Sequence, residues 1–301
     1  MKQLKVCVTF DVDLSDYTND GAEVDELAFL FSEVIPELRR DERLRATWFV
    51  RLDAQVEALY GHADYFFERY EREFRALSAE GHEIGWHPHS YLKTDEGWKQ
   101  NTSSESVREE LERYAPRVKG YGIKSVRTGW GFHTNETMRA LSDSGFLLDS
   151  SAIPRPAYSW ESSRKDWETT PCEPYFPSQA DYRAPGEPHL SILEVPMSVT
   201  EIAAPYDRAA VTRYINLAYH PELMKAPLAA WLERKDHLVT ITHPYELMPA
   251  REAHGLLAFD LNAMRRNLST LEELAEERGA ELSFMTLSEF ALMTMGVENH
   301  A

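Results

Sequence analysis

Short apolar segments alternate with helical patterns along almost the whole chain. The segments that predict buried strands span residues 5–10, 46–50, 84–86, 124–127, 146–149, 190–196, 238–242 and 282–285. Helical spacing is found between and after them, at residues 24–38, 53–77, 104–118, 134–144, 208–233, 259–278 and 287–295. Apolar strands that alternate with helices indicate parallel pairing, and this many units favour a closed barrel over an open sheet. We therefore predict one α/β domain over residues 1–301, without an internal repeat or linker.

Polar side chains stand where these strands end. They are Asp11, Asp13, His87, His89, Arg127, Asp149 and His243. In a β/α barrel the carboxyl ends of all strands share one rim, and active sites are built there. Polar groups placed only for stability would not be expected to choose that rim so often. The sequence therefore predicts a functional site at the rim.

The most distinctive part of the rim is the segment 81–91, which holds three of the eleven histidines. Alternation along an extended backbone places His87 and His89 on one face, and it does the same for Asp11 and Asp13. Two imidazoles on one face can give a metal ion two nitrogen ligands. A histidine cluster at a strand end can also serve only to cap hydrogen bonds, and the other rim residues favour the metal site.

Charge and cysteine content narrow the class of protein. The chain has 301 residues, 43% of them hydrophobic, and a formal net charge of -18 with a pI near 5.1. This charge argues against nucleic acid or an anionic membrane surface as partner and suits a neutral or cationic small molecule. The two cysteines, Cys7 and Cys172, cannot form a disulfide framework or a thiolate metal site. With no recognisable signal peptide or membrane span, we expect a cytoplasmic protein; a homo-oligomer remains open.

Residues 152–189 show neither helical nor strand periodicity and are rich in proline, tyrosine and tryptophan. Loops of this length are uncommon unless they have a function, such as forming a wall of a substrate cleft. The aromatic residues between 157 and 182 fit two roles. They can form a stacking surface for a sugar ring or another flat substrate, or an apolar anchor for the loop.

Several motifs, in this order, resemble those of the polysaccharide deacetylase family, the NodB-like carbohydrate esterases. They lie at 9–13 (Thr-Phe-Asp-Val-Asp), 46–50, 81–87 (Gly-His-Glu-Ile-Gly-Trp-His), 127–131, 145–151, 193–196, 241–246 and 284–289. The resemblance covers nearly the whole chain and implies an irregular (β/α)7 barrel. It also implies metal-dependent removal of an acetyl or similar N-acyl group from a sugar or a related small amide.

Two motifs depart from the family pattern. Val12 separates two aspartates that are adjacent in the family, and the family's second metal histidine would fall on Tyr91. His89 is the nearby substitute. The resemblance implies that Asp13 and His87, here with His89, hold one divalent ion. We expect zinc, with cobalt, nickel, manganese or iron as alternatives.

The resemblance also implies catalytic roles. Asp11 would be the general base that takes a proton from water, and His243 would protonate the departing amine. Arg127 would orient Asp11 and keep it ionised. From the residues alone, His243 can also be a buried hydrogen-bonded histidine and Arg127 a structural ion pair. Asp149 and Tyr91 are expected to contact these residues without binding the metal, and Asp149 would hydrogen-bond to a histidine or to Arg127.

Two other functions stay open at the level of sequence. One is an allantoinase-like hydrolase that acts on a cyclic or ureide amide. The other is a carbohydrate-binding or regulatory barrel that has lost the metal. Metal content separates the second from the hydrolases, and substrate profiling separates the two hydrolases.

Overall fold

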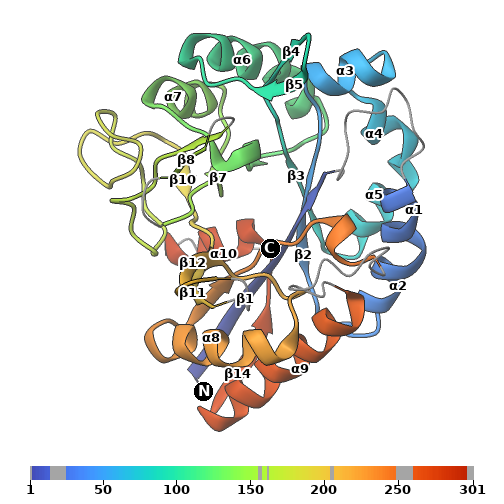
Figure 1. Cartoon of the computed structure of the whole chain (residues 1–301), viewed down its shortest axis with the longest axis vertical. Coiled ribbons are helices and arrows are strands. Elements are labelled where there is room, and N and C mark those ends of the chain that lie inside the picture. Colours follow the sequence, from blue (N-terminus) through green and yellow to red (C-terminus); the bar gives the residue numbers. More distant parts are fainter. Residues whose placement is uncertain are drawn as a thin grey trace.

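The computed structural model describes residues 2–13, 25–154, 158–160, 163–203, 207–248 and 260–296. Their central element is an eight-stranded sheet in the order β10-β7-β6-β3-β2-β1-β13, with β14 also paired to β1 (Figure 1). Its strands are β1 (Lys2–Val12), β2 (Ala46–Val50), β3 (Glu83–Trp86), β6 (Ser125–Val126), β7 (Leu148–Asp149), β10 (Leu193–Glu194), β13 (His237–Val239) and β14 (Ala280–Phe284). All of these pairings are parallel, as predicted.

The sheet is organised around β1, the longest of these strands. The carboxyl-terminal half of β1 pairs with β2, so that Val8 lies opposite Ala46 and Val12 opposite Val50. Its amino-terminal half pairs with β14, and β13 lies on its other side. Phe10 of β1 stacks on Trp48 of β2 with ring centroids 4.1 Å apart.

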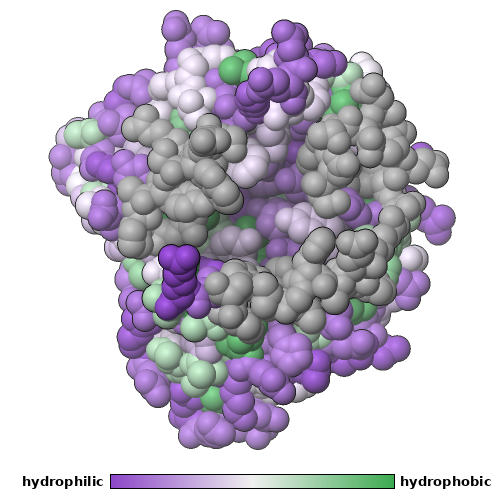
Figure 2. All heavy atoms as spheres, viewed as in Figure 1, coloured by the Kyte–Doolittle hydropathy of each residue, from purple (hydrophilic) through white to green (hydrophobic). Residues whose placement is uncertain are grey.

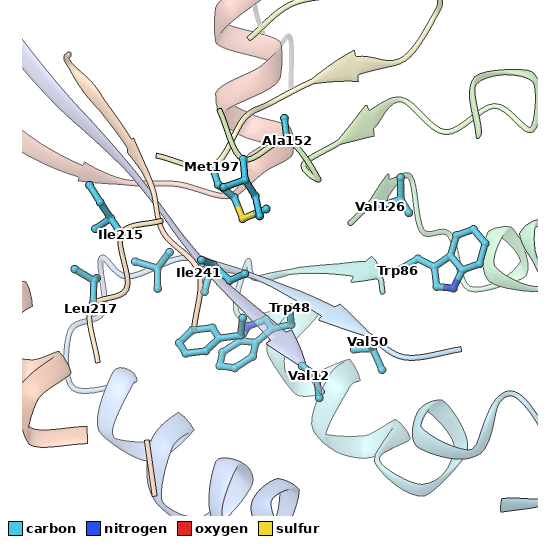
Figure 3. Packing of buried hydrophobic residues seen from close by; sticks show 14 of the residues in the cluster. Val12, Trp48, Val50, Trp86, Val126, Ala152, Met197, Ile215, Leu217 and Ile241 are labelled. Carbon is cyan, nitrogen blue, oxygen red and sulfur yellow. The ribbon is translucent and has the colours of Figure 1, made fainter. Parts of the chain in front are cut away.

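Apolar side chains from neighbouring strands meet in the core. Figure 3 shows Val12, Trp48, Trp86 and Val126, which come from β1, β2, β3 and β6. Burial of each such side chain contributes roughly 1.5–3 kcal/mol. A smaller cluster joins Cys7 of β1 to Phe49 of β2 and Val239 of β13. Because side chains alternate along a strand, Asp11 lies on the same side of β1 as Cys7.

The sheet curls until its two ends approach each other. Ser198, which follows β10, donates its backbone N–H to the Val239 carbonyl oxygen of β13 at 2.9 Å, and its hydroxyl accepts from the Val239 N–H at 2.9 Å. The predicted irregular (β/α)7 barrel is confirmed. The sheet is a curled parallel half-barrel, because β10 and β13 at its two ends are not paired as strands. The contact of Ser198 with Val239 bridges the gap between them.

Helices surround the sheet in the order expected from the sequence (Figure 1). They are α1 (Asp25–Phe29), a π-helical turn (Leu30–Val34), α2 (Ile35–Leu38), α3 (Ala54–Tyr60), α4 (Tyr65–Arg69), α5 (Glu71–Ala79), α6 (Ser104–Gly120), α7 (Asn135–Asp143), α8 (Pro221–Arg234), α9 (Leu261–Glu277) and α10 (Leu287–Thr294). Thr134 and Thr286 cap α7 and α10, each through a capping box. None of the described helices combines the length and apolarity needed to cross a membrane.

Antiparallel hairpins form where the sequence predicts no strand. The helix expected over 208–233 is wrong in its first half, where β12 (Val211–Tyr214) pairs with β11 (Val199–Ile202). Val-Thr-Arg-Tyr is a β-forming sequence, and Pro221 opens the helix at its first position. A hairpin of β4 (Tyr91–Thr94) and β5 (Gly97–Gln100) follows the histidine segment without a sequence prediction.

The excursion 152–189 is not wholly irregular. It contains a short hairpin of β8 (Tyr158–Trp160) and β9 (Ser163–Lys165). Its described aromatic side chains favour the anchoring role, because Trp167 and Tyr182 are buried and meet edge to face at 4.9 Å. The Trp167 indole donates to the Gly131 carbonyl oxygen at 2.7 Å. The side chains at 157–160, and the predicted helix ends at 24 and 259, lie outside the described residues.

Candidate active site

Six predicted rim residues converge at the carboxyl ends of the strands. They are Asp11, Asp13, His87, His89, Arg127 and His243. Figure 2 shows a hollow near the centre of one face, with hydrophilic and intermediate residues visible inside it. In the same view of the ribbon, β1 runs toward this central region (Figure 1).

Two histidines and one aspartate face one another. The Nε2 atoms of His87 and His89 are 3.1 Å apart, and Asp13 Oδ2 lies 3.1 Å from His89 Nε2 and 4.0 Å from His87 Nε2. All three side chains are buried. The alternation argument is therefore confirmed for the histidines, because residues two apart direct the same ring atom to one point.

The protonation of His87 suits a metal ligand. Its Nδ1 donates to the Arg127 carbonyl oxygen at 2.7 Å, which leaves the Nε2 lone pair directed toward Asp13 and His89. Burial lowers the pKa of His87 to about 4, so the ring is neutral at neutral pH. Burial alone would raise the pKa of Asp13, but His89 and Arg51 outweigh it and hold that pKa well below its usual range.

These three residues fit one divalent ion. Two donors that bind an ion at roughly 2.0–2.2 Å lie about 3.0–3.5 Å apart at common coordination angles. Two of the three separations, both 3.1 Å, match this range and the third, 4.0 Å between His87 and Asp13, is somewhat wider; the ligand atoms of all three residues lie within 4.8 Å of one another. A carboxylate with two imidazoles is also a donor set that zinc and related ions accept.

Asp11 lies beside this group and is bound by Arg127. The Arg127 Nη1 donates to Asp11 Oδ1 at 2.8 Å, and the other oxygen of Asp11 is 3.8 Å from His87 Nε2. Burial alone would raise the pKa of Asp11, but the charge of Arg127 and the nearby histidines lower it. Arg127 is held in turn by Ser150, whose carbonyl oxygen and hydroxyl accept from its Nε and Nη2. Asp11 is therefore an ionised carboxylate in a fixed position.

His243 is oriented by Glu246. The His243 Nδ1 donates to Glu246 Oε2 at 3.1 Å, and the His243 backbone N–H donates to the same oxygen at 2.7 Å. Burial alone would lower the pKa of His243, but Glu246 first, then Asp11 and Asp13, outweigh it and raise the pKa to about 9. His243 can therefore carry a proton on Nε2 at neutral pH. The ring also stacks on Tyr245, with centroids 5.2 Å apart.

The segment after Arg127 packs tightly against His89. A Cβ atom at Gly129 would lie 2.2 Å from the His89 ring, so the segment approaches the ring as closely as it does only because this residue is glycine. The next residue, Trp130, has a φ of 62°, a strained value for a residue with a side chain. Its indole meets the His89 ring edge to face at 5.9 Å. This turn fixes one side of the His89 ring.

The two predicted supporting residues occupy different places. Tyr91 stacks on His89, with ring centroids 5.3 Å apart and an interplanar angle of 7°. Asp149 lies beside a histidine, with its Oδ2 atom 3.3 Å from His133 Nε2, and it accepts from the Ser151 hydroxyl at 2.7 Å. The arginine of the site is bound by Ser150 instead.

Sequence reasoning missed Arg51 and Glu246. Arg51 directly follows the buried strand 46–50, so the rim rule applied to that strand would have found it. Glu246 follows His243 by three residues, which is the spacing of a capping box. Both signals were present in the sequence, and both residues bind a predicted site residue.

Comparison with known proteins shows the fold. No family model matches the chain, and no curated protein matches its sequence. A presumed polysaccharide deacetylase from Mycobacterium smegmatis superposes with a TM-score of 0.57 at 19% identity, over 98% of this chain and 92% of that chain. A family 4 carbohydrate esterase from Streptomyces lividans, solved with acetate, reaches 0.40 at 14% identity, over 93% and 90%. The first of these likenesses shows that the chain shares the fold of that presumed polysaccharide deacetylase, the fold that its motifs predict.

Proposed function

We propose that this protein is a metal-dependent hydrolase that removes an N-acyl group, such as acetyl, from a sugar or a related small amide. The observation that carries the proposal is the convergence of Asp13, His87 and His89 beside an ionised Asp11, together with a histidine on the same rim that can hold a proton. The deacetylase fold supports the same conclusion.

Asp13, His87 and His89 would hold the ion, which we propose to be zinc. When bound, such an ion makes a water molecule more acidic and polarises the carbonyl group of an amide. Three protein ligands leave positions for that water and the substrate. Burial keeps the His87 imidazole neutral, which is the form that binds a metal.

Asp11 would act as the general base. Its ionised carboxylate lies next to the ligand group, 3.8 Å from His87 Nε2, and can accept the proton of the attacking water. Arg127 serves this role by stabilising the charged form of Asp11 and by fixing its position through the 2.8 Å contact. The carboxylate is therefore ready to accept a proton at neutral pH.

His243 would act as the general acid. Breaking an amide requires a proton on the leaving nitrogen, because an amide anion is a poor leaving group. Glu246 binds Nδ1 of His243, so the proton that His243 donates is the one on Nε2. The base and the acid are thus separate groups, each with a partner that favours its working protonation state.

The test begins with metal analysis of the purified protein, followed by assays of amine release from N-acetylated sugars and of ureide hydrolysis. Amine release that is lost with a chelator and restored by zinc would support the proposal. Ureide hydrolysis without amine release would assign the allantoinase-like function instead. A protein that binds sugar but takes up no metal and shows no turnover would be a binding or regulatory barrel.

A further inference from the structure

A buried arginine that the proposed mechanism does not use lies directly behind the metal ligands. Arg51 follows β2 and its side chain is 0% exposed. We infer that Arg51 and Asp53 are positioning residues that set the affinity of the site for its metal ion, by holding Asp13 and His89. This inference rests on the proposed function, because it concerns the same ion.

Arg51 binds one of the two oxygens of Asp13. The Arg51 Nη1 donates to Asp13 Oδ1 at 2.8 Å, whereas Asp13 Oδ2 lies 3.1 Å from His89 Nε2. One oxygen of the carboxylate is therefore occupied and the other is turned toward the histidines. Arg51 in this way presents Asp13 to an ion through a single oxygen, in a fixed orientation.

Asp53 links Arg51 to the histidine segment. It accepts from Arg51 through both oxygens, at Nε and at Nη2, and its Oδ2 also accepts the backbone N–H of His89 at 3.2 Å. Its Oδ1 caps helix α3 by accepting the Val56 N–H at 3.0 Å. Asp53 is itself fully buried. The Arg51–Asp53 pair therefore connects two metal ligands that come from different strands.

His89 depends on this support more than His87 does. A ligating histidine is usually oriented by an acceptor at its second ring nitrogen, and the Arg127 carbonyl provides one for His87. The Nδ1 atom of His89 is buried and has no hydrogen-bond partner among the described residues. Its ring is held by stacking on Tyr91, and the Arg51 guanidinium lies 5.8 Å from the centroid of that tyrosine ring.

The two arginines of the site thus bind different residues. Arg127 binds Asp11 with its side chain and His87 with its carbonyl oxygen. Arg51 binds Asp13 directly and supports His89 through Asp53 and Tyr91. This arrangement explains how a His-x-His pair can replace the wider histidine spacing of the resembled family. It also predicts that changes at the two arginines have different effects.

The test measures the zinc affinity of metal-free protein by competition with a chromophoric chelator. The informative variant is the double substitution Arg51→Met with Asp53→Asn, which removes both charges of the Arg51–Asp53 ion pair and leaves Asp13 with His89 as its neighbour at 3.1 Å. We expect its zinc affinity to fall by about 10- to 100-fold, the usual effect of losing residues that support metal ligands. Arg51→Lys retains a charge that reaches only one of the two aspartates, so an intermediate loss is expected.

The control is a matched pair elsewhere in the chain. Arg213 and Asp207 form a bidentate ion pair, with distances of 2.8 and 2.9 Å, on and before β12. Arg213→Met with Asp207→Asn should lower the melting temperature but leave zinc affinity unchanged. Arg127→Lys provides a second comparison, because it should reduce amine release while zinc affinity stays close to that of wild type.

The outcomes separate this inference from the proposed function. Folded Arg51 variants that bind zinc as tightly as wild type would overturn the inference and leave the proposed function intact. The same loss of affinity in the control pair would also overturn it, since the effect would then be one of general stability. A wild-type protein that takes up no divalent metal would overturn the proposed function, and the inference with it.

Discussion

Replacing Glu246 by glutamine tests whether a local carboxylate keeps the proton on His243. Glu246 Oε2 accepts from His243 Nδ1 and from the His243 backbone N–H, and it also accepts from Asn216 Nδ2 at 2.7 Å. Glutamine has the same shape and keeps one acceptor oxygen, so the capping turn at 243–246 should persist. The substitution removes mainly the negative charge.

The size of the effect follows from the pKa of His243. That pKa is raised to about 9 in spite of burial, and Glu246 is the first of the groups that raise it, before Asp11 and Asp13. Without the Glu246 charge we expect the pKa to return toward its ordinary value of about 6.5 or below. A fall from about 9 to about 6.5 corresponds to roughly 3 kcal/mol.

The same shift predicts how stability depends on pH. Because the folded-state pKa of His243 is raised, the protonated ring stabilises the fold fully below about pH 6.5, and this contribution is lost as the pH rises through about 9. At pH 6 the free energy of unfolding of Glu246→Gln should therefore be lower than that of wild type by up to about 3 kcal/mol. The difference should narrow between pH 7 and 9.

Two measurements check this reasoning. NMR titration of His243 in metal-free protein should show its midpoint moving from about 9 toward 6.5 in Glu246→Gln. In zinc-loaded protein the alkaline limb of the rate profile for amine release should move to lower pH by a similar difference. An unchanged NMR midpoint in a folded variant would refute the assignment of Glu246 as the group that holds this proton.

Three further substitutions test the remaining parts of the site. His87→Ala should abolish both metal uptake and turnover, and full metal occupancy measured by elemental analysis would contradict this. Asp11→Asn should retain the metal and lose most amine release; loss of metal instead would mean that Asp11 and Asp13 have exchanged roles. Gly129→Ala should displace the His89 ring, because the new Cβ would lie 2.2 Å from it. Chelator competition should show weaker zinc binding, with a stability loss of about 1–3 kcal/mol in denaturant unfolding.

The strands and the rim could be predicted because their signals are local. The predicted strand 46–50 coincides with β2, and alternation alone placed His87 and His89 on one face. The curvature of the sheet then brings residues far apart in the chain together, and for this the positional rule at strand ends was sufficient. The fold and six of its rim residues therefore followed from the sequence.

What the sequence did not reveal depends on tertiary contacts. The segment 211–214 was assigned to a helix, because nothing local identifies β11 as its pairing partner. The role of Asp149 was left between two partners, and only the structure shows that it lies beside His133. The position of Arg51 after the strand 46–50 was a usable signal, but its contact with Asp13 is visible only in the structure.

Asp11 and Asp13 are bound by two different arginines, and this has a consequence for how such a protein can evolve. The residues around one arginine could be altered while those around the other are kept. If Arg51 acts as inferred, substitutions around it would change how tightly the ion is held while the contact of Arg127 with Asp11 stays in place. The chain would then be a starting point for redesign in which metal affinity and proton transfer are adjusted one at a time.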